Sequence, residues 1–282
     1  MAGLRRGCLL ALPFPLVIAA CSGDASDDAG GSPDDTSVPS RATGAPSTET
    51  DASAPDTQSP PPAPTPTCAA NAKSGEYCGG DKVDDADART LYQCDGPGPA
   101  KVVSVCAHGC FVATGQDDFC RATIAACAKA SLLTYGLAPD ASDHLRCSGL
   151  DAGDISQTIG DAAASAGTHA QDGTIGGKAY CAATDLRVGG LTNAEVRQLL
   201  DVLASQGFAA FFRDPGKDGW PASEARHVHA IYAGVPMKAA LRAQVQDWLA
   251  GKNGLASHGP YAFYQASPAK KLAIQELFAK ND

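Results

Sequence analysis

The spacing of the cysteines constrains the fold of this chain more than any other feature. Eleven cysteines occur in 282 residues, and six of them fall between residues 68 and 120. A segment of that size, rich in turn-forming glycines, buries too little apolar area to be stable without cross-links. Cysteines at this density also argue against a reducing cytoplasm. We therefore expect a small disulfide-rich β module at residues 68–127.

Two strands are predicted within this module, Thr90–Cys94 and Lys101–Cys106, facing each other as a hairpin. The cysteines involved are Cys68, Cys78, Cys94, Cys106, Cys110 and Cys120. They can form three bridges in many combinations, and the sequence leaves the connectivity open. A zinc site on Cys106, His108 and Cys110 is the alternative, but the spacing is not Cys-x2-Cys and exported thiols oxidise.

Residues 1–20 are typical of an export signal. Arg5 and Arg6 precede an apolar run that ends at Ala20 and is too short to span a bilayer. The residues Ile18-Ala19-Ala20-Cys21 resemble a bacterial lipobox. This resemblance implies that Cys21 becomes the lipidated first residue of the mature protein, and that Ser22 after it favours the outer membrane.

The segment 21–67 has no residues from which to build a core. After Cys21 it contains no Leu, Ile, Met or aromatic residue, but nine prolines and eight acidic residues. A segment that buries no apolar surface cannot offset the entropy lost on ordering. We expect a disordered tether, stiffest at Pro60–Pro62, that holds the folded part of the chain off a membrane and near the cell wall.

The charge balance argues against nucleic acid as a partner. The chain has 31 acidic and 22 basic residues, which gives a formal net charge of −9. A nucleic-acid-binding protein needs a basic surface to neutralise phosphates.

Residues 128–282 mix the periods of helices and strands, which favours an α+β domain with a small antiparallel sheet. Thr192 and Glu195 form a capping box at the start of one helix. Helices are predicted at 155–166, from Thr192 to Gly207, at 237–250 and after Ser267; strands are predicted at 180–188, 208–213 and 227–232. We expect Trp220 and Tyr232 in the core, with the walls of a cleft as the alternative, and His144 on the surface.

Three cysteines follow the six between residues 68 and 120 in the sequence, Cys127, Cys147 and Cys181. Cys147 and Cys181 both lie inside the C-terminal domain, and we expect them to pair with each other. Cys127 then has no assigned partner.

The histidines of this domain indicate a metal site. His227 and His229 are two residues apart in a predicted strand, so both imidazoles lie on one face. Glycines between His169 and Asp185 allow the chain to turn back as a hairpin and bring these two residues together. Two histidines and one aspartate around an open fourth position form a catalytic zinc set.

This arrangement resembles the zinc peptidases of the D-Ala-D-Ala carboxypeptidase, lysostaphin-type and Hedgehog superfamily, in which an upstream His and Asp precede a distal His-x-His or Glu-x-x-His. The resemblance implies that His169 and Asp185 are ligands. In the first pattern, which we prefer, His229 is the third ligand and His227 the catalytic residue. In the second, His227 is the ligand and Glu224 the base. Asp172 is the alternative carboxylate ligand.

The resemblance also implies a function. It is that of a membrane-anchored zinc peptidase that hydrolyses peptidoglycan stem peptides, as a carboxypeptidase or an endopeptidase. The alternative is a non-catalytic lipoprotein that binds cell wall or carbohydrate. The cysteine-rich module resembles small modules of secreted bacterial hydrolases. In the alternative function this module binds the ligand, and the zinc domain is a retained scaffold.

The lipobox generates the first prediction. Cys21→Ser should abolish labelling with fatty acid and move the protein from the membrane fraction to the soluble fraction, because the thiol is the expected acceptor. Metabolic labelling with a tagged fatty acid measures this. Continued labelling of the variant would show that Cys21 is not the lipidated residue.

Overall fold

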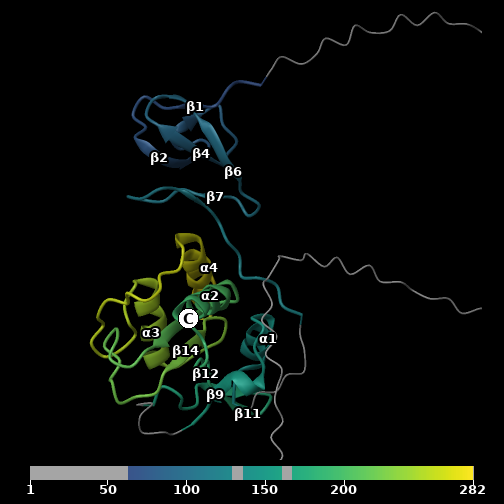
Figure 1. Ribbon diagram of the computed structural model, residues 1–282. Helices are drawn as coiled ribbons and strands as arrows, with labels where there is room; N and C mark the ends of the chain where they lie inside the picture. The colour runs from purple at the N-terminus through teal and green to yellow at the C-terminus, as the bar shows by residue number, and fades with distance from the viewer. Residues whose placement is uncertain (1–62, 129–135, 161–166, 282) are drawn as a thin grey trace, which may run out of the picture. The chain divides into compact units, whose positions relative to one another are not determined.

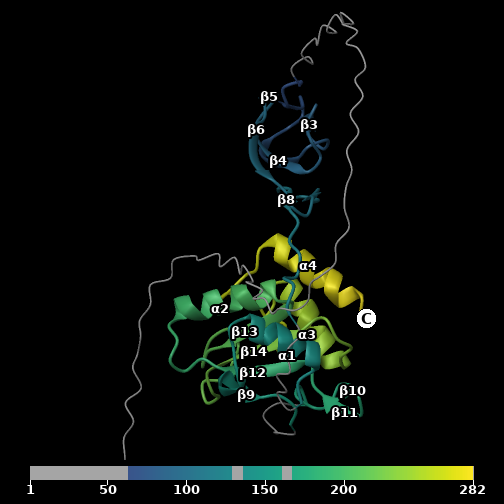
Figure 2. The same ribbon diagram turned by 90° about the vertical axis from the view of Figure 1, so that its right-hand side faces the viewer.

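The computed structural model describes residues 63–128, 136–160 and 167–281 (Figures 1 and 2). The predicted export signal, Cys21 and the tether up to residue 62 lie outside these ranges. The predicted tether ends later than the structure allows, because Thr67 already pairs in a strand. No helix of the described ranges has the length and apolarity needed to cross a bilayer.

The cysteine-rich module consists of small antiparallel sheets. One sheet joins β2 (Ser74–Cys78), β4 (Thr90–Asp95) and β6 (Lys101–Val105). The predicted pairing of 90–94 with 101–106 is confirmed by the register of β4 and β6. The remaining strands are β1 (Thr67–Cys68), β3 (Val83–Asp84), β5 (Gly98–Pro99), β7 (Cys110–Phe111) and β8 (Phe119–Cys120).

Three disulfides cross-link these sheets, as predicted. The bridges are Cys68–Cys94, Cys78–Cys110 and Cys106–Cys120. The module has few buried apolar side chains apart from its cysteines, chiefly Val83 and Tyr92. The bridges therefore supply what the core lacks. The alternative zinc site is wrong, because Cys106 and Cys110 are both oxidised and have different partners.

The C-terminal domain is α+β, as predicted, and is built on a four-stranded antiparallel sheet. The strand order is β13 (Phe208–Arg213), β14 (His227–Tyr232), β12 (Ala183–Arg187) and β9 (Ile155–Gln157). A separate hairpin joins β10 (Gly173–Ile175) to β11 (Lys178–Tyr180). The helices are α1 (Pro139–Cys147), α2 (Asn193–Ser205), α3 (Ala239–Leu249) and α4 (Pro268–Ala279).

Helix α2 begins at the predicted capping box. The Thr192 hydroxyl accepts a hydrogen bond from the Glu195 backbone N–H, and the Glu195 carboxylate accepts one from the Thr192 N–H. Both bonds satisfy N–H groups that the helix itself leaves without partners. The helix is followed by Gly207 at φ +89°, a conformation that favours glycine. The face with Val196 and Leu200 is buried, and the helix contacts β13.

Two secondary-structure predictions for this domain were wrong in part. The helix predicted from Ile155 begins instead as strand β9, since Asp151 and Asp154 close a short 3-10 turn before it (Ala152–Asp154). The end of this predicted helix, residues 161–166, lies outside the described ranges. The strand predicted at 180–188 is divided between β11 and β12. Helix α1 was not predicted.

The predicted Cys147–Cys181 disulfide is wrong. Cys147, at the end of α1, bonds instead to Cys127, with their Cα atoms 6.0 Å apart. Cys181 lies between β11 and β12, fully buried, and its backbone N–H donates to the Gly136 carbonyl. Its thiol is therefore held inside the core, and burial raises its pKa to about 12.

These cysteines generate the second prediction. Removing the Cys127–Cys147 bridge with Cys127→Ser and Cys147→Ser should lower the free energy of unfolding by about 3 kcal/mol, because the bridge closes a loop of 20 residues. Urea unfolding measures the loss. Mass spectrometry of an unreduced digest should recover both cysteines in one linked peptide pair. Recovery of Cys181 in a linked pair would contradict the assignment, and Cys181→Ala is the control that should keep every bridge.

Candidate metal centre

The register of the central strands brings the candidate residues to one face of the sheet. Asp185 on β12 lies directly opposite His229 on β14, and Arg187 lies opposite His227. Side chains two residues apart on a strand share a face. The side chains of Asp185, His227 and His229 therefore gather over the same part of the sheet, while Val228 between the two histidines is buried in the core.

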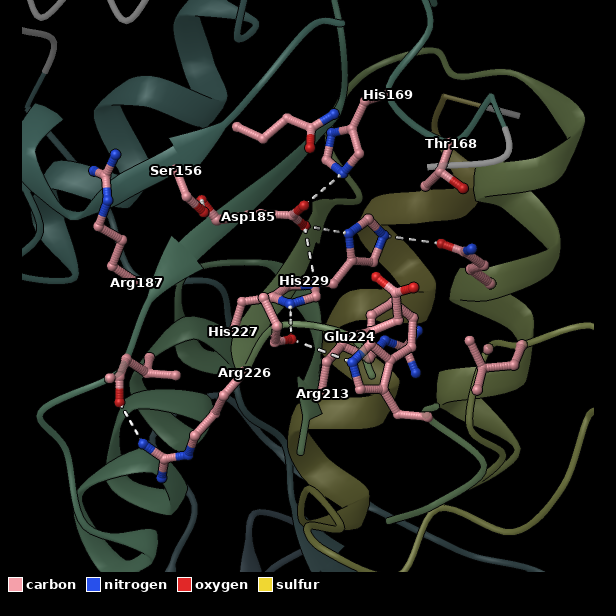
Figure 3. A pocket seen from close by; sticks show the side chains of 18 of the residues that line it. Ser156, Thr168, His169, Asp185, Arg187, Arg213, Glu224, Arg226, His227 and His229 are labelled. Atoms are coloured by element: carbon pink, nitrogen blue, oxygen red, sulfur yellow. Dashed lines mark hydrogen bonds and ion pairs between the residues drawn. The ribbon is translucent and has the colours of Figure 1, made fainter. Parts of the chain in front are cut away.

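His169 reaches this face from the segment before the β10–β11 hairpin, as predicted. Its Nε2 lies 3.1 Å from the Oδ2 of Asp185, and its Nδ1 lies 2.7 Å from the Thr158 carbonyl oxygen. His169 is only 2% exposed. Figure 3 shows Asp185 between His169 and His229, with the carboxylate facing both rings.

One ligand atom from each of His169, Asp185 and His229 lies within 4.8 Å of the others. The Thr158 carbonyl can only accept, so His169 Nδ1 donates and Nε2 of the neutral ring has a lone pair. His229 lies in a similar frame, with Nε2 3.0 Å from Gln244 Oε1 and Nδ1 2.8 Å from Asp185 Oδ1. Two ring lone pairs beside a carboxylate repel one another unless a cation lies between them. That cation is either a bound metal ion or a proton on each ring. The group could therefore hold a metal ion.

The electrostatics of the site suit metal binding. Burial alone would raise the pKa of Asp185, but when His169 and His229 carry protons that face its carboxylate, their hydrogen bonds and charge outweigh burial and hold the pKa well below its usual range. Burial lowers the pKa of His229, and Asp185 offsets this only in part. At neutral pH Asp185 is therefore ionised and His229 is neutral, the states in which both coordinate metals.

The group opens onto a cavity of about 850 Å³. His227 and Glu224 line it, as does Trp220, which we had expected in the core. Trp220 forms part of the wall instead, because its Nε1 donates to the Ala225 carbonyl and its ring meets the His227 ring at 77°. Tyr232 is buried, as predicted. His144 is half-buried rather than on the surface, since its ring stacks on Tyr232.

His227 lies beside the three-residue group and is not one of its members. Its Nδ1 lies 2.9 Å from the Ala225 carbonyl oxygen and therefore donates to it, which leaves the lone pair on Nε2. Nε2 is 3.7 Å from Asp185 Oδ1. Glu224 is half-buried, and within the described ranges its carboxylate has no hydrogen bond or ion pair. Both side chains are thus free to exchange a proton with a molecule in the cavity.

Asp172, the alternative carboxylate ligand, has a structural role instead. Its oxygens accept hydrogen bonds from the backbone N–H groups of Ala182 and Lys238, and it forms an ion pair with the Lys238 ammonium. It thereby ties the β10–β11 hairpin to the segment before α3 and is not part of the candidate metal-binding group of His169, Asp185 and His229, called the metal-binding group below.

Two residues of the site were missed from the sequence, Gln244 on α3 and Arg213 at the end of β13. Gln244 gave no signal, because its contact with His229 depends on how α3 packs. Arg213 could have been found from the sequence, because the strand at 208–213 was predicted. Residues two apart share a face of a strand, so the charged Arg213 is expected on the same face as the apolar Phe211. In the sheet Arg213 pairs with His227.

Comparisons of the chain with protein-family models, curated proteins and solved structures find no match.

The geometry generates the third prediction. His169→Ala or His229→Ala should abolish stoichiometric binding of a divalent metal, because each removes a ring nitrogen from the group. Gln244→Ala should weaken binding by about 10–100-fold, since it removes the residue that orients His229. Calorimetric titration of metal-free protein measures both effects.

His258→Ala is the matched control, because His258 is also paired with an aspartate, Asp247, but lies outside the group. It should bind metal like the wild type. Unchanged binding by His229→Ala would rule out this set of ligands.

Proposed function

We propose that this chain is an exported, lipid-anchored zinc peptidase that hydrolyses peptide bonds in peptidoglycan stem peptides. The observation that carries the proposal is the convergence of His169, Asp185 and His229 at a cavity lined by His227 and Glu224. Two imidazoles and one carboxylate are the donors of catalytic zinc sites, which keep a position open for water or substrate.

Zinc, when bound by these three residues, supplies a Lewis acid that polarises a carbonyl and makes water nucleophilic near neutral pH. The rest of the chemistry belongs to the protein. His227 holds its ring by donating from Nδ1 to the Ala225 carbonyl. Nε2 can therefore take a proton from the attacking water and return it to the leaving amine.

Glu224 is the second candidate for proton transfer. Its carboxylate lines the same cavity and has no partner within the described ranges. If His227 were a ligand in place of His229, Glu224 would be the base. The grouping of His229 with His169 and Asp185 favours the first arrangement.

The expected location of the chain in the cell envelope supports this substrate class. The predicted export signal, the lipobox at Cys21 and the long tether would hold the site beside the cell wall, whose peptides are the nearby polymer. The disulfides of the structure are consistent with an oxidising compartment.

The fourth prediction separates ligands from the proton carrier. His227→Ala should keep bound zinc and lower kcat on purified muropeptides by about 10²–10⁴-fold, because it removes a general base. Glu224→Gln should leave most activity. Product release by mass spectrometry and zinc content by atomic absorption measure the two effects, and His258→Ala is the control.

Two results would overturn parts of this proposal. Loss of zinc in His227→Ala, with zinc retained in His229→Ala, would make His227 the ligand and Glu224 the base. Bound zinc without turnover of any muropeptide would favour the non-catalytic wall-binding protein.

A further inference from the structure

The cavity contains a buried cation that the proposed mechanism does not use. Arg213 is 3% exposed, lines the cavity, and lies at the end of β13. Its partner across the sheet is His227, the proposed proton carrier. A charged side chain is seldom this buried unless it is paired.

Arg213 has no such partner in the described parts of the chain. Its Nη1 donates one hydrogen bond, to the Asn253 carbonyl at 2.7 Å, and within those parts no carboxylate oxygen lies within 4.0 Å of the guanidinium. A guanidinium has five N–H donors, so most of those of Arg213 have no protein acceptor among the described residues. Burial lowers the pKa of Arg213 to about 10, and more distant acidic groups offset this only in part.

The aromatic rings around Arg213 hold it in place. The guanidinium carbon lies 4.7 Å from the centroid of the Phe211 ring and 5.5 Å from that of Trp220. The other arginines near the cavity are already engaged. Arg226 donates to the carbonyls of Val188 and Leu191. Arg213 is thus oriented by its surroundings, and its charge is available to an anionic group of a molecule that enters the cavity.

The sheet places Arg213 on the same face as the metal-binding group. His229 and Asp185 form one cross-strand pair, and His227 and Arg213 lie in the next pair on the same face. Such pairs are about 6.6 Å apart along a strand. Arg213 also lines the same cavity as His169, Asp185 and His229, so one small substrate can contact both the cation and the metal-binding group.

We propose that Arg213 binds the terminal carboxylate of the substrate, so that the enzyme removes the last residue of a peptide and does not cut within a chain. This inference rests on the proposed function. A guanidinium matches a carboxylate in charge and in its paired N–H geometry. The free carboxylate supplies the anion that Arg213 lacks, and an internal peptide has none at this position.

The test compares two ligands that differ only in this charge, N-acetyl-D-Ala-D-Ala and its C-terminal amide. Calorimetry on the full chain, with metal removed by a chelator, should show about 10–100-fold tighter binding of the acid. Arg213→Gln should abolish this preference by weakening only the acid. Arg213→Lys should retain part of it, because lysine keeps the charge but loses the fork.

Arg197→Gln is the matched control. Arg197 also donates to one backbone carbonyl and stacks on a ring, that of Phe263, but it does not line the cavity. This variant should keep the preference for the acid. Zinc titration of Arg213→Gln should show unchanged stoichiometry, which verifies that the fold and the metal-binding group are intact.

Turnover separates this inference from the proposed function. With zinc bound, Arg213→Gln should raise KM for the acid by about 10–100-fold and leave cleavage of the amide unchanged. A wild type that prefers the acid in binding but cleaves neither ligand would refute the peptidase and keep the carboxylate site. Equal binding of acid and amide by the wild type, or equal weakening of both in Arg213→Gln, would overturn the carboxylate site.

Discussion

The antiparallel pairing of β12 with β14 is the interaction on which the candidate site depends. Leu186 faces Val228 across these strands, and both are fully buried. This apolar pair fixes the register, because a shift by one residue would turn both side chains out of the core. The same register puts Asp185 opposite His229. The core and the candidate metal-binding group are therefore specified together.

The third member of the group is held by polar contacts of a different kind. His169 lies in an irregular segment, where its ring bonds the Thr158 carbonyl and its own carbonyl accepts from the Gly160 N–H. Asp172 ties the following hairpin to Lys238. Irregular backbone holds a side chain in place when its polar groups are satisfied, and these contacts satisfy several of them.

The lining of the cavity includes two charged side chains of opposite sign, Asp185 and Arg213. Asp185 is the anion at the metal-binding group, and it is surrounded by His169 and His229. Arg213 is the cation one pair further along, and aromatic rings surround it. A buried charge of either sign is costly without a counter-charge. In our proposals zinc balances the first and the substrate's carboxylate balances the second.

The sequence alone was enough for the local features of this protein. The capping box at Thr192, the strands at 208–213 and 227–232 and the common face of His227 and His229 all follow from neighbours within a few residues. The three bridges of the small module followed from composition, since a segment with so few apolar residues needs cross-links.

The tertiary structure decided everything that depends on distant parts of the chain. Cys127 rather than Cys181 bonds Cys147, and Ile155–Gln157 joins the sheet as an edge strand. The contact of Gln244 with His229, and the lack of a carboxylate partner for Arg213 among the described residues, are also of this kind. Each depends on which elements pack together, and the free energy of that packing is shared among many residues far apart in the sequence. No local pattern records it.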